Sequence, residues 1–166
     1  MESGFKPEGE LLNTKENRDL LASRSGLERA MKTGETVEGV ATVCDGEMRL
    51  QVDLGCMRGI ILPEEAVFCR PGESRKDIAV VSRVGKPVAV KIMAFTERNG
   101  ETVALLSRRA AQRDCLERHL MRLCAGDIIP GRVTHMEPFG AFLDIGCGVS
   151  SLLSVDCISV SRISHP

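Results

Sequence analysis

Two stretches of the chain are altered copies of one another, GETVEGVATVCDGEMRLQVDLG (34–55) and GDIIPGRVTHMEPFGAFLDIG (126–146). The offset between equivalent residues is 92 at Gly126, 91 at Asp144 and 92 again at Ser151. One residue is therefore lost from one loop and regained in the next, while the strand-like segments keep their length. Loops absorb such changes and paired strands do not, so the pattern indicates two copies of one small β domain.

The first copy has the sequence of a small barrel. Apolar and polar residues alternate on both sides of the turn at Asp45 and Gly46, which predicts a hairpin with one buried face. Asn99 and Gly100 predict a second tight turn between two later strands. The expected strands cover 37–43, 50–54, 59–62, 87–95 and 102–106. Five short strands separated by turn signals predict a barrel of the oligonucleotide/oligosaccharide-binding (OB) type.

Helical signals flank the first copy. Residues 1–24 are polar and mixed in charge, so we expect a frayed arm with a helical turn at 16–22. Ser25 followed by Glu28 predicts a capping box for a short helix that ends at Gly34.

After the first copy, a longer helix is expected over 107–124, capped by Ser107 and terminated by Gly126. Its apolar side is expected to consist of Leu116, Leu120 and Leu123. Its basic residues are Arg108, Arg109, Arg113, Arg118 and Arg122. Two interpretations remain open, a solvated spacer between two barrels or a helix that contacts phosphates.

Composition limits the possible functions. The chain of 166 residues lacks an apolar run near the roughly 20 residues of a membrane span, and lacks a signal peptide, so we expect a soluble cytoplasmic protein with no membrane partner. Seven cysteines without a Cys-x-x-Cys pair, and three scattered histidines, predict buried or half-buried thiols and no metal or other cofactor. No phosphate-binding loop, carboxylate cluster or activated nucleophile is evident, so we expect neither an enzyme nor a small-molecule substrate.

Charge further restricts how nucleic acid could bind. The net charge is −1; residues 34–107 hold nine Lys and Arg against eleven Asp and Glu, and residues 126–166 hold two against four. Neither copy can bind mainly by neutralising phosphates. Any nucleic-acid contact must depend on stacking and local geometry.

The second copy carries aromatic residues that the first lacks. Alignment on the first hairpin turns Ala141, Leu143 and Ile145 inward. The outward row is then Gly140, Phe142 and Asp144. Phe142 stands where the first copy has Gln51, and an exposed ring on a sheet is a candidate platform for a base. The turn residues beside Phe139 could aim its ring the same way, and Arg132 projects from the neighbouring strand. From the residues alone, the two rings could equally cover a barrel end or pack on the basic helix.

The whole of 126–166, including the Phe-Gly-Ala-Phe element (139–142) and the ending ISVSRISHP (158–166), resembles the S-one RNA-binding domain, the module named for the repeat-containing protein of the bacterial small ribosomal subunit. Residues 34–107 resemble it more loosely. The resemblance implies a five-stranded OB-fold barrel that binds single-stranded RNA, with Phe139 and Phe142 matching the family's stacking aromatics. Ser154 stands where the family often has a histidine, and Met48 and Gln51 replace the aromatics in the first copy.

These observations predict a mainly β protein with two tandem S-one-type OB-fold barrels joined by a helix. The parts are an arm and short helix (1–33), a diverged first barrel (34–107), a basic linker helix (108–125) and a second barrel (126–166) that holds only its first three strands. An incomplete barrel suggests a fragment of a longer protein with further repeats.

The function expected is non-catalytic binding of single-stranded messenger RNA in translation, at the small ribosomal subunit, through Phe139, Phe142 and Arg132. The first copy would dock to protein or act as a spacer. Two alternatives remain, a protein-docking scaffold and the accessory RNA-binding region of a ribonuclease or polynucleotide phosphorylase.

Overall fold

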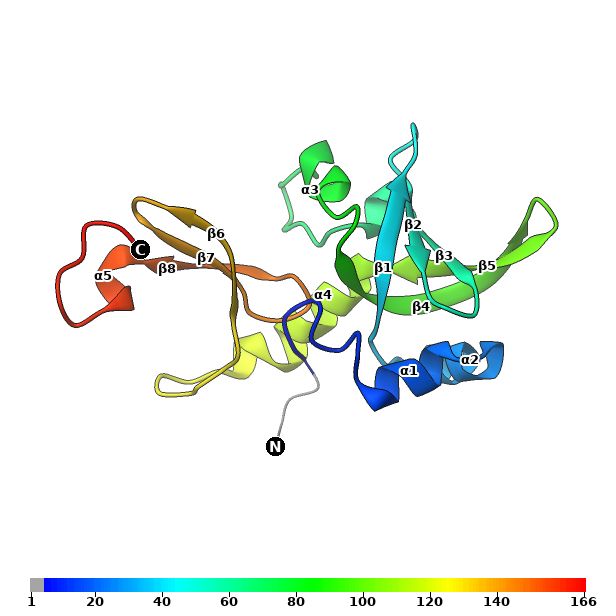
Figure 1. Ribbon diagram of the computed structural model, residues 1–166, viewed down its shortest axis with the longest axis horizontal. Coiled ribbons are helices and arrows are strands. Elements are labelled where there is room, and N and C mark those ends of the chain that lie inside the picture. The colour runs from blue at the N-terminus through cyan, green and yellow to red at the C-terminus, as the bar shows by residue number, and fades with distance from the viewer. Residues whose placement is uncertain (1–4) are drawn as a thin grey trace.

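The computed structural model describes residues 5–166; residues 1–4, the start of the predicted arm, lie outside the described part. The fold is mainly β, with a closed five-stranded barrel and a separate three-stranded sheet, and the helix α4 (Arg108–Arg118) lies between them (Figure 1). Both sheets are consistent with OB-fold-like domains.

The five strands of the barrel are β1 (Val37–Cys44), β2 (Leu50–Asp53), β3 (Arg58–Ile61), β4 (Pro87–Arg98) and β5 (Glu101–Ser107). They follow the order β1-β2-β3-β5-β4, and the pairing of β1 with β4 closes the barrel. All five predicted strands are confirmed. Only β3 and β5 pair in parallel, and the long connection from β3 to β4 contains η1 (Pro63–Glu65) and α3 (Asp77–Val81).

Local chemistry explains both predicted turns. The Asp45 carboxylate accepts hydrogen bonds from the backbone N–H groups of Glu47 and Arg49, each at 3.0 Å, and so holds the β1–β2 turn. Asn99 and Gly100 both have positive φ, 52° and 77°, the backbone that a two-residue hairpin loop requires.

The barrel interior is tightly packed. Each strand contributes buried apolar side chains, among them Val37, Leu50, Ile61, Val90 and Leu106. Leu27 and Ala30 of α2 (Arg24–Thr33) join the same cluster, so this helix covers one end of the barrel. Gly59 lies directly against the Leu106 side chain, where there is no room for a further carbon atom.

The cap of α2 differs from the prediction. Ser23, not Ser25, is the N-cap residue, and its hydroxyl accepts the N–H of Gly26 at 3.1 Å. The Glu28 side chain pairs with Arg24 instead of turning back to a cap. The preceding helix α1 (Lys15–Leu21) is capped by Thr14, and Gly34, with φ of 71°, ends α2 as predicted.

The helix α4 begins as predicted and ends earlier. The Ser107 hydroxyl accepts the N–H of Ala110 at 2.8 Å, but the helix stops at Arg118 and a 3₁₀ turn, η2 (Leu120–Arg122), follows. The prediction of a leucine face was wrong. The buried residues are Arg108, Ala111, Gln112 and Cys115, since this i, i+3, i+4, i+7 face packs on the barrel.

The second sheet repeats the pairing of the first barrel. Its strands are β6 (Arg132–Glu137), β7 (Gly140–Asp144) and β8 (Ser150–Ser154), followed by α5 (Val155–Ile158). A bulge interrupts β6 after Val133, at the place where β1 is interrupted after Ala41. Between β1 and β2 the pairs are Val40 with Asp53, Ala41 with Val52, Val43 with Gln51 and Cys44 with Leu50. Between β6 and β7 the corresponding pairs are Arg132 with Asp144, Val133 with Leu143, His135 with Phe142 and Met136 with Ala141. The internal repeat is therefore structural as well as sequential.

The expectation of a frayed arm was wrong for the described residues. Residues 5–12 run between the barrel and the second sheet, because buried side chains of both parts satisfy the arm's backbone. The Glu38 carboxylate accepts the N–H groups of Gly9 at 3.0 Å and Leu12 at 2.9 Å, and Asn17 in α1 exchanges two hydrogen bonds with the Glu38 backbone.

The thiols only partly match the expectation. Cys115 and Cys147 are buried and Cys44 and Cys69 half-buried. The exposed thiols are Cys56, Cys124 and Cys157. In the described part of the chain, no helix is long and apolar enough to cross a membrane.

Replacing Gly59 by Ala is expected to lower the free energy of unfolding by about 1–3 kcal/mol, because the new methyl group would overlap Leu106 in a full core. Gly46→Ala is the matched control: nothing lies within 4 Å of its added carbon. Its effect should stay within about 0.5 kcal/mol. Chemical denaturation followed by circular dichroism measures both, and equal effects would contradict the packing argument.

Glu38 should make stability depend on pH. Burial raises its pKa to about 7, against the hydrogen bonds from Gly9 and Leu12. The folded state therefore holds the Glu38 proton more tightly than the unfolded state does, and this contribution to stability, full below about pH 4.5, is lost as the pH rises through 7. Glu38→Gln should thus gain stability relative to the wild type between pH 5 and 8, by at most about 3 kcal/mol. Parallel melting-temperature profiles for the two proteins would refute this.

Candidate functional site

The outer face of the second sheet gathers three rings. Phe142 on β7 pairs directly with His135 on β6 and with Leu152 on β8, so the three side chains share one face. The rings of His135 and Phe142 are stacked, with centroids 6.2 Å apart and an angle of 27° between their planes. Leu152, which is 49% exposed, extends this face beyond the rings.

Phe139 completes the group from the turn between β6 and β7. Its ring meets that of Phe142 edge-on, with centroids 6.2 Å apart at 86°, and Phe139 as a residue is 54% exposed. The Phe139 carbonyl accepts the N–H of Val155 at 2.9 Å, which ties the turn to α5. The structure thus brings Phe139 and Phe142 together, as the turn residues around them suggested. We call Phe139, Phe142 and His135 the ring platform.

Sequence reasoning missed His135. Its Nε2 lies 2.6 Å from Glu137 Oε1, so one edge of the imidazole is held by its own strand while one face lies against Phe142. The repeat held a signal for this contact. His135 corresponds to Val43 of the first copy and Phe142 corresponds to Gln51; because Val43 pairs with Gln51, His135 is expected beside Phe142.

Arg132 lies on the same face of the sheet as the rings, but its side chain is hydrogen-bonded to the arm. It pairs with Asp144, at the end of β7 away from the turn. Its Nη1 donates to the backbone carbonyl of Glu8 at 3.0 Å, so part of the guanidinium is committed to the arm. The structure therefore does not bring Arg132 to the rings in the way that it brings His135.

Asp144 corrects the predicted outward row. It was expected on a wet face, but it is only 6% exposed because the arm covers this end of the sheet. Its Oδ2 accepts the Glu8 N–H at 2.8 Å, and its Oδ1 accepts the N–H groups of Gly146 and Gly148 at 2.9 and 3.0 Å. Burial raises the pKa of Asp144, and these hydrogen bonds oppose the rise. Gly140, in the same row, is also buried, against the backbone of Leu153.

The opposite face of this sheet is apolar and partly open. Ala141 is buried as predicted, and Leu143 and Ile145 are half-buried. Val133 and Met136, which pair with Leu143 and Ala141, are 55% and 54% exposed. The equivalent face of the first copy is the barrel core, which β4 and β5 enclose.

The basic helix matches neither of its two interpretations fully. Arg108 is buried and bound to Glu8, so it is neither solvated nor available to phosphate. Arg109 lies 3.8 Å from Glu65, and Arg118 lies 3.4 Å from Asp114. The sequence showed that the helix is basic. It did not show that most of its arginines lie beside acidic side chains.

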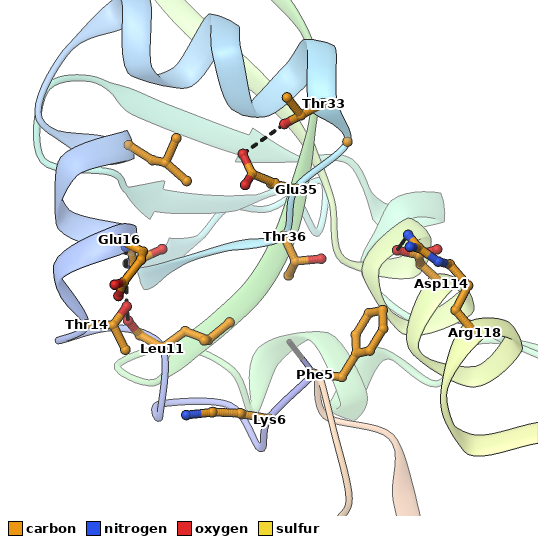
Figure 2. Close-up of a pocket in the computed structure, with 13 residues that line it drawn as sticks. Phe5, Lys6, Leu11, Thr14, Glu16, Thr33, Glu35, Thr36, Asp114 and Arg118 are labelled. Atoms are coloured by element: carbon orange, nitrogen blue, oxygen red, sulfur yellow. Dashed lines mark hydrogen bonds and ion pairs between the residues drawn. The ribbon is translucent and has the colours of Figure 1, made fainter. Parts of the chain in front are cut away.

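A broad hollow of about 510 Å³ lies between the arm, the first helices and α4 (Figure 2). Its walls mix Lys6 and Arg118 with Glu16, Glu35 and Asp114, and the Thr33 hydroxyl binds Glu35 within it. This lining does not converge on one ligand chemistry. Among the described residues, no group of three His, Cys, Asp or Glu side chains could hold a metal ion.

The fold and the ring platform define a class: a small β protein of OB-like sheets with an aromatic surface on the second copy. Comparison with known proteins then shows what the chain is similar to. The chain is 33% identical over 150 residues to a small ribosomal subunit protein bS1 from Leuconostoc lactis, covering 90% of this chain and 33% of the relative. It is 29% identical to the bS1 proteins of Streptococcus pneumoniae and Neisseria meningitidis, over 93% and 100% of this chain.

This similarity shows a relationship to the bS1 family over most of the chain and confirms the resemblance to the S-one proteins. The chain spans between 28% and 40% of the length of these three relatives. No family model matches it.

Proposed function

We propose that this chain is a non-catalytic RNA-binding protein of the ribosomal bS1 type, which holds single-stranded messenger RNA at the small ribosomal subunit in the cytoplasm during translation. The observation that carries the proposal is the ring platform, where Phe139, Phe142 and His135 lie on one face. Aromatic rings on an OB-like sheet stack with any unpaired base, since every base has a flat π face.

Composition and geometry both favour binding by base stacking over binding by phosphate neutralisation. The second copy is acidic overall, and Arg132, which strand pairing places on this face, already donates to the arm. Stacking requires no excess of positive charge, whereas phosphate neutralisation does. Arg132 would therefore have a smaller part in RNA binding than either phenylalanine.

In this proposal residues 34–107 and 126–166 are tandem OB-fold domains of the S-one type, joined by the helical segment 108–125. The first domain has Val43 and Gln51 where the second has His135 and Phe142, so it lacks a platform at the same place. It would serve as a docking or spacer module. Association with the small ribosomal subunit is supported by the relatives, which are small ribosomal subunit proteins by name.

Phe142→Gln, which installs the residue of the first copy, is expected to weaken binding of a single-stranded RNA about 5- to 150-fold, because one base–ring stack is worth roughly 1–3 kcal/mol. Fluorescence anisotropy of a labelled oligonucleotide measures the change. Phe142→Tyr keeps the ring and should bind nearly as the wild type does. Binding should fall only gently with added salt, because few phosphates are neutralised.

Two control variants separate this platform from the basic helix. Arg113→Gln and Arg122→Gln remove exposed positive charges of 108–125 and should leave RNA binding within about threefold of the wild type. If these variants lost RNA binding and Phe142→Gln did not, the RNA-binding site would be on the helix and not on the ring platform. No RNA binding by the folded chain would favour the docking scaffold.

A further inference from the structure

The arm connects the two sheets through its backbone. The carbonyl of Lys6 accepts the Cys147 N–H at 2.9 Å, and the N–H of Glu8 donates to Asp144; both partners belong to the second copy. A few residues later, Gly9 and Leu12 donate to Glu38 in the barrel. One short segment is thus hydrogen-bonded to both sheets within residues 6–12.

The Glu8 side chain anchors this segment on the barrel side. Its two oxygens accept the Nε and Nη2 groups of Arg108 at 2.6 and 2.9 Å, a two-point contact. The N–H of Ala89 in β4 donates to the same carboxylate at 3.1 Å, and Arg83 lies 3.3 Å away. Both side chains of the Glu8 and Arg108 pair are only 5% exposed.

The electrostatics of Glu8 favour the bound arrangement. Burial alone would raise its pKa, but the Arg108 guanidinium, with the Ala89 N–H and Arg83, lowers it, so the carboxylate is ionised at neutral pH. A buried ion that loses its partner is strongly destabilised. Withdrawal of the arm would leave the guanidinium of Arg108 without its carboxylate.

Other contacts in the described part of the chain also join the two parts. Gln112 of α4 donates to the carbonyl of Gly148 at 3.1 Å, and Cys115 packs with Cys147 and Ala89 in a minor apolar cluster that also includes Phe5 of the arm. Among the described residues, the arm therefore provides the most extensive polar link between the barrel and the second sheet.

We propose that residues 5–12 act as a strap that holds the barrel and the second sheet in one fixed orientation, with Glu8 as its latch. The ring platform then keeps a constant position relative to the first barrel. The strap acts on the arrangement of the two sheets whether or not the platform binds RNA.

Glu8→Gln in the full chain tests the strap. It keeps the shape of the side chain and removes its charge, so the latch should weaken. The variant replaces charged hydrogen bonds to Arg108 by weaker neutral ones, so the strap should open more often. Hydrogen exchange should then show a loss of about tenfold or more in protection of the Cys147 amide, which donates to the Lys6 carbonyl of the strap. In nitrogen-15 relaxation, the second sheet should tumble faster than the barrel, whereas in the wild type the two should tumble together.

Glu10→Gln is the matched control, since Glu10 is an exposed carboxylate of the same segment, and it should change neither readout. Asp144→Asn weakens the strap from the other sheet and leaves the hydrogen bonds between Glu8 and Arg108 in place, so it serves if Glu8→Gln unfolds the barrel. Unchanged Cys147 protection and common tumbling in both strap variants would overturn the proposal. Independent tumbling of the two parts in the wild type would overturn it as well.

Discussion

The buried pair of Glu8 and Arg108 is the constraint on which the arrangement of this molecule depends. Each residue taken alone would be an isolated charge in an apolar setting, and a buried charge is tolerated only when it is paired and hydrogen-bonded. The pair forms only if the arm returns to α4 after the chain has built a barrel between them. Arg108 sits next to Ser107, so the barrel strand β5, the cap of α4 and the arm meet at one point.

The repeat explains why the second sheet has the same bulge and the same strand pairing as the first barrel. Equal spacing of apolar residues leads to equal register, because a shift by one residue would turn every side chain to the other face. Within this shared frame, substitution at a few outward positions changes the surface. Gln51 and Val43 leave the first copy without rings at this place, whereas Phe142 and His135 give the second copy an aromatic surface.

Much of the fold could be predicted because its signals are local. Alternating residues predicted the strands, and Asp45, Asn99 and Gly34 marked the turns and the end of α2, since each works through its own backbone or its near neighbours. The turn residues beside Phe139 allowed its ring to meet that of Phe142, but the sequence left this open and the structure decided it. The capping of α2 was misplaced by two residues, because Ser23 accepts the N–H of Gly26 and Ser25 already lies within the helix.

The sequence by itself determined the two β copies, the alternation of residues along their strands and the presence of aromatics in only one of them, because residue spacing within a strand or hairpin carries this information. Only the tertiary structure decided that the arm is ordered, that Arg108 and Asp144 are buried, and that His135 stacks on Phe142. These features arise where groups far apart in the chain meet; Glu8 and Arg108 are 100 residues apart, and no local pattern records that contact.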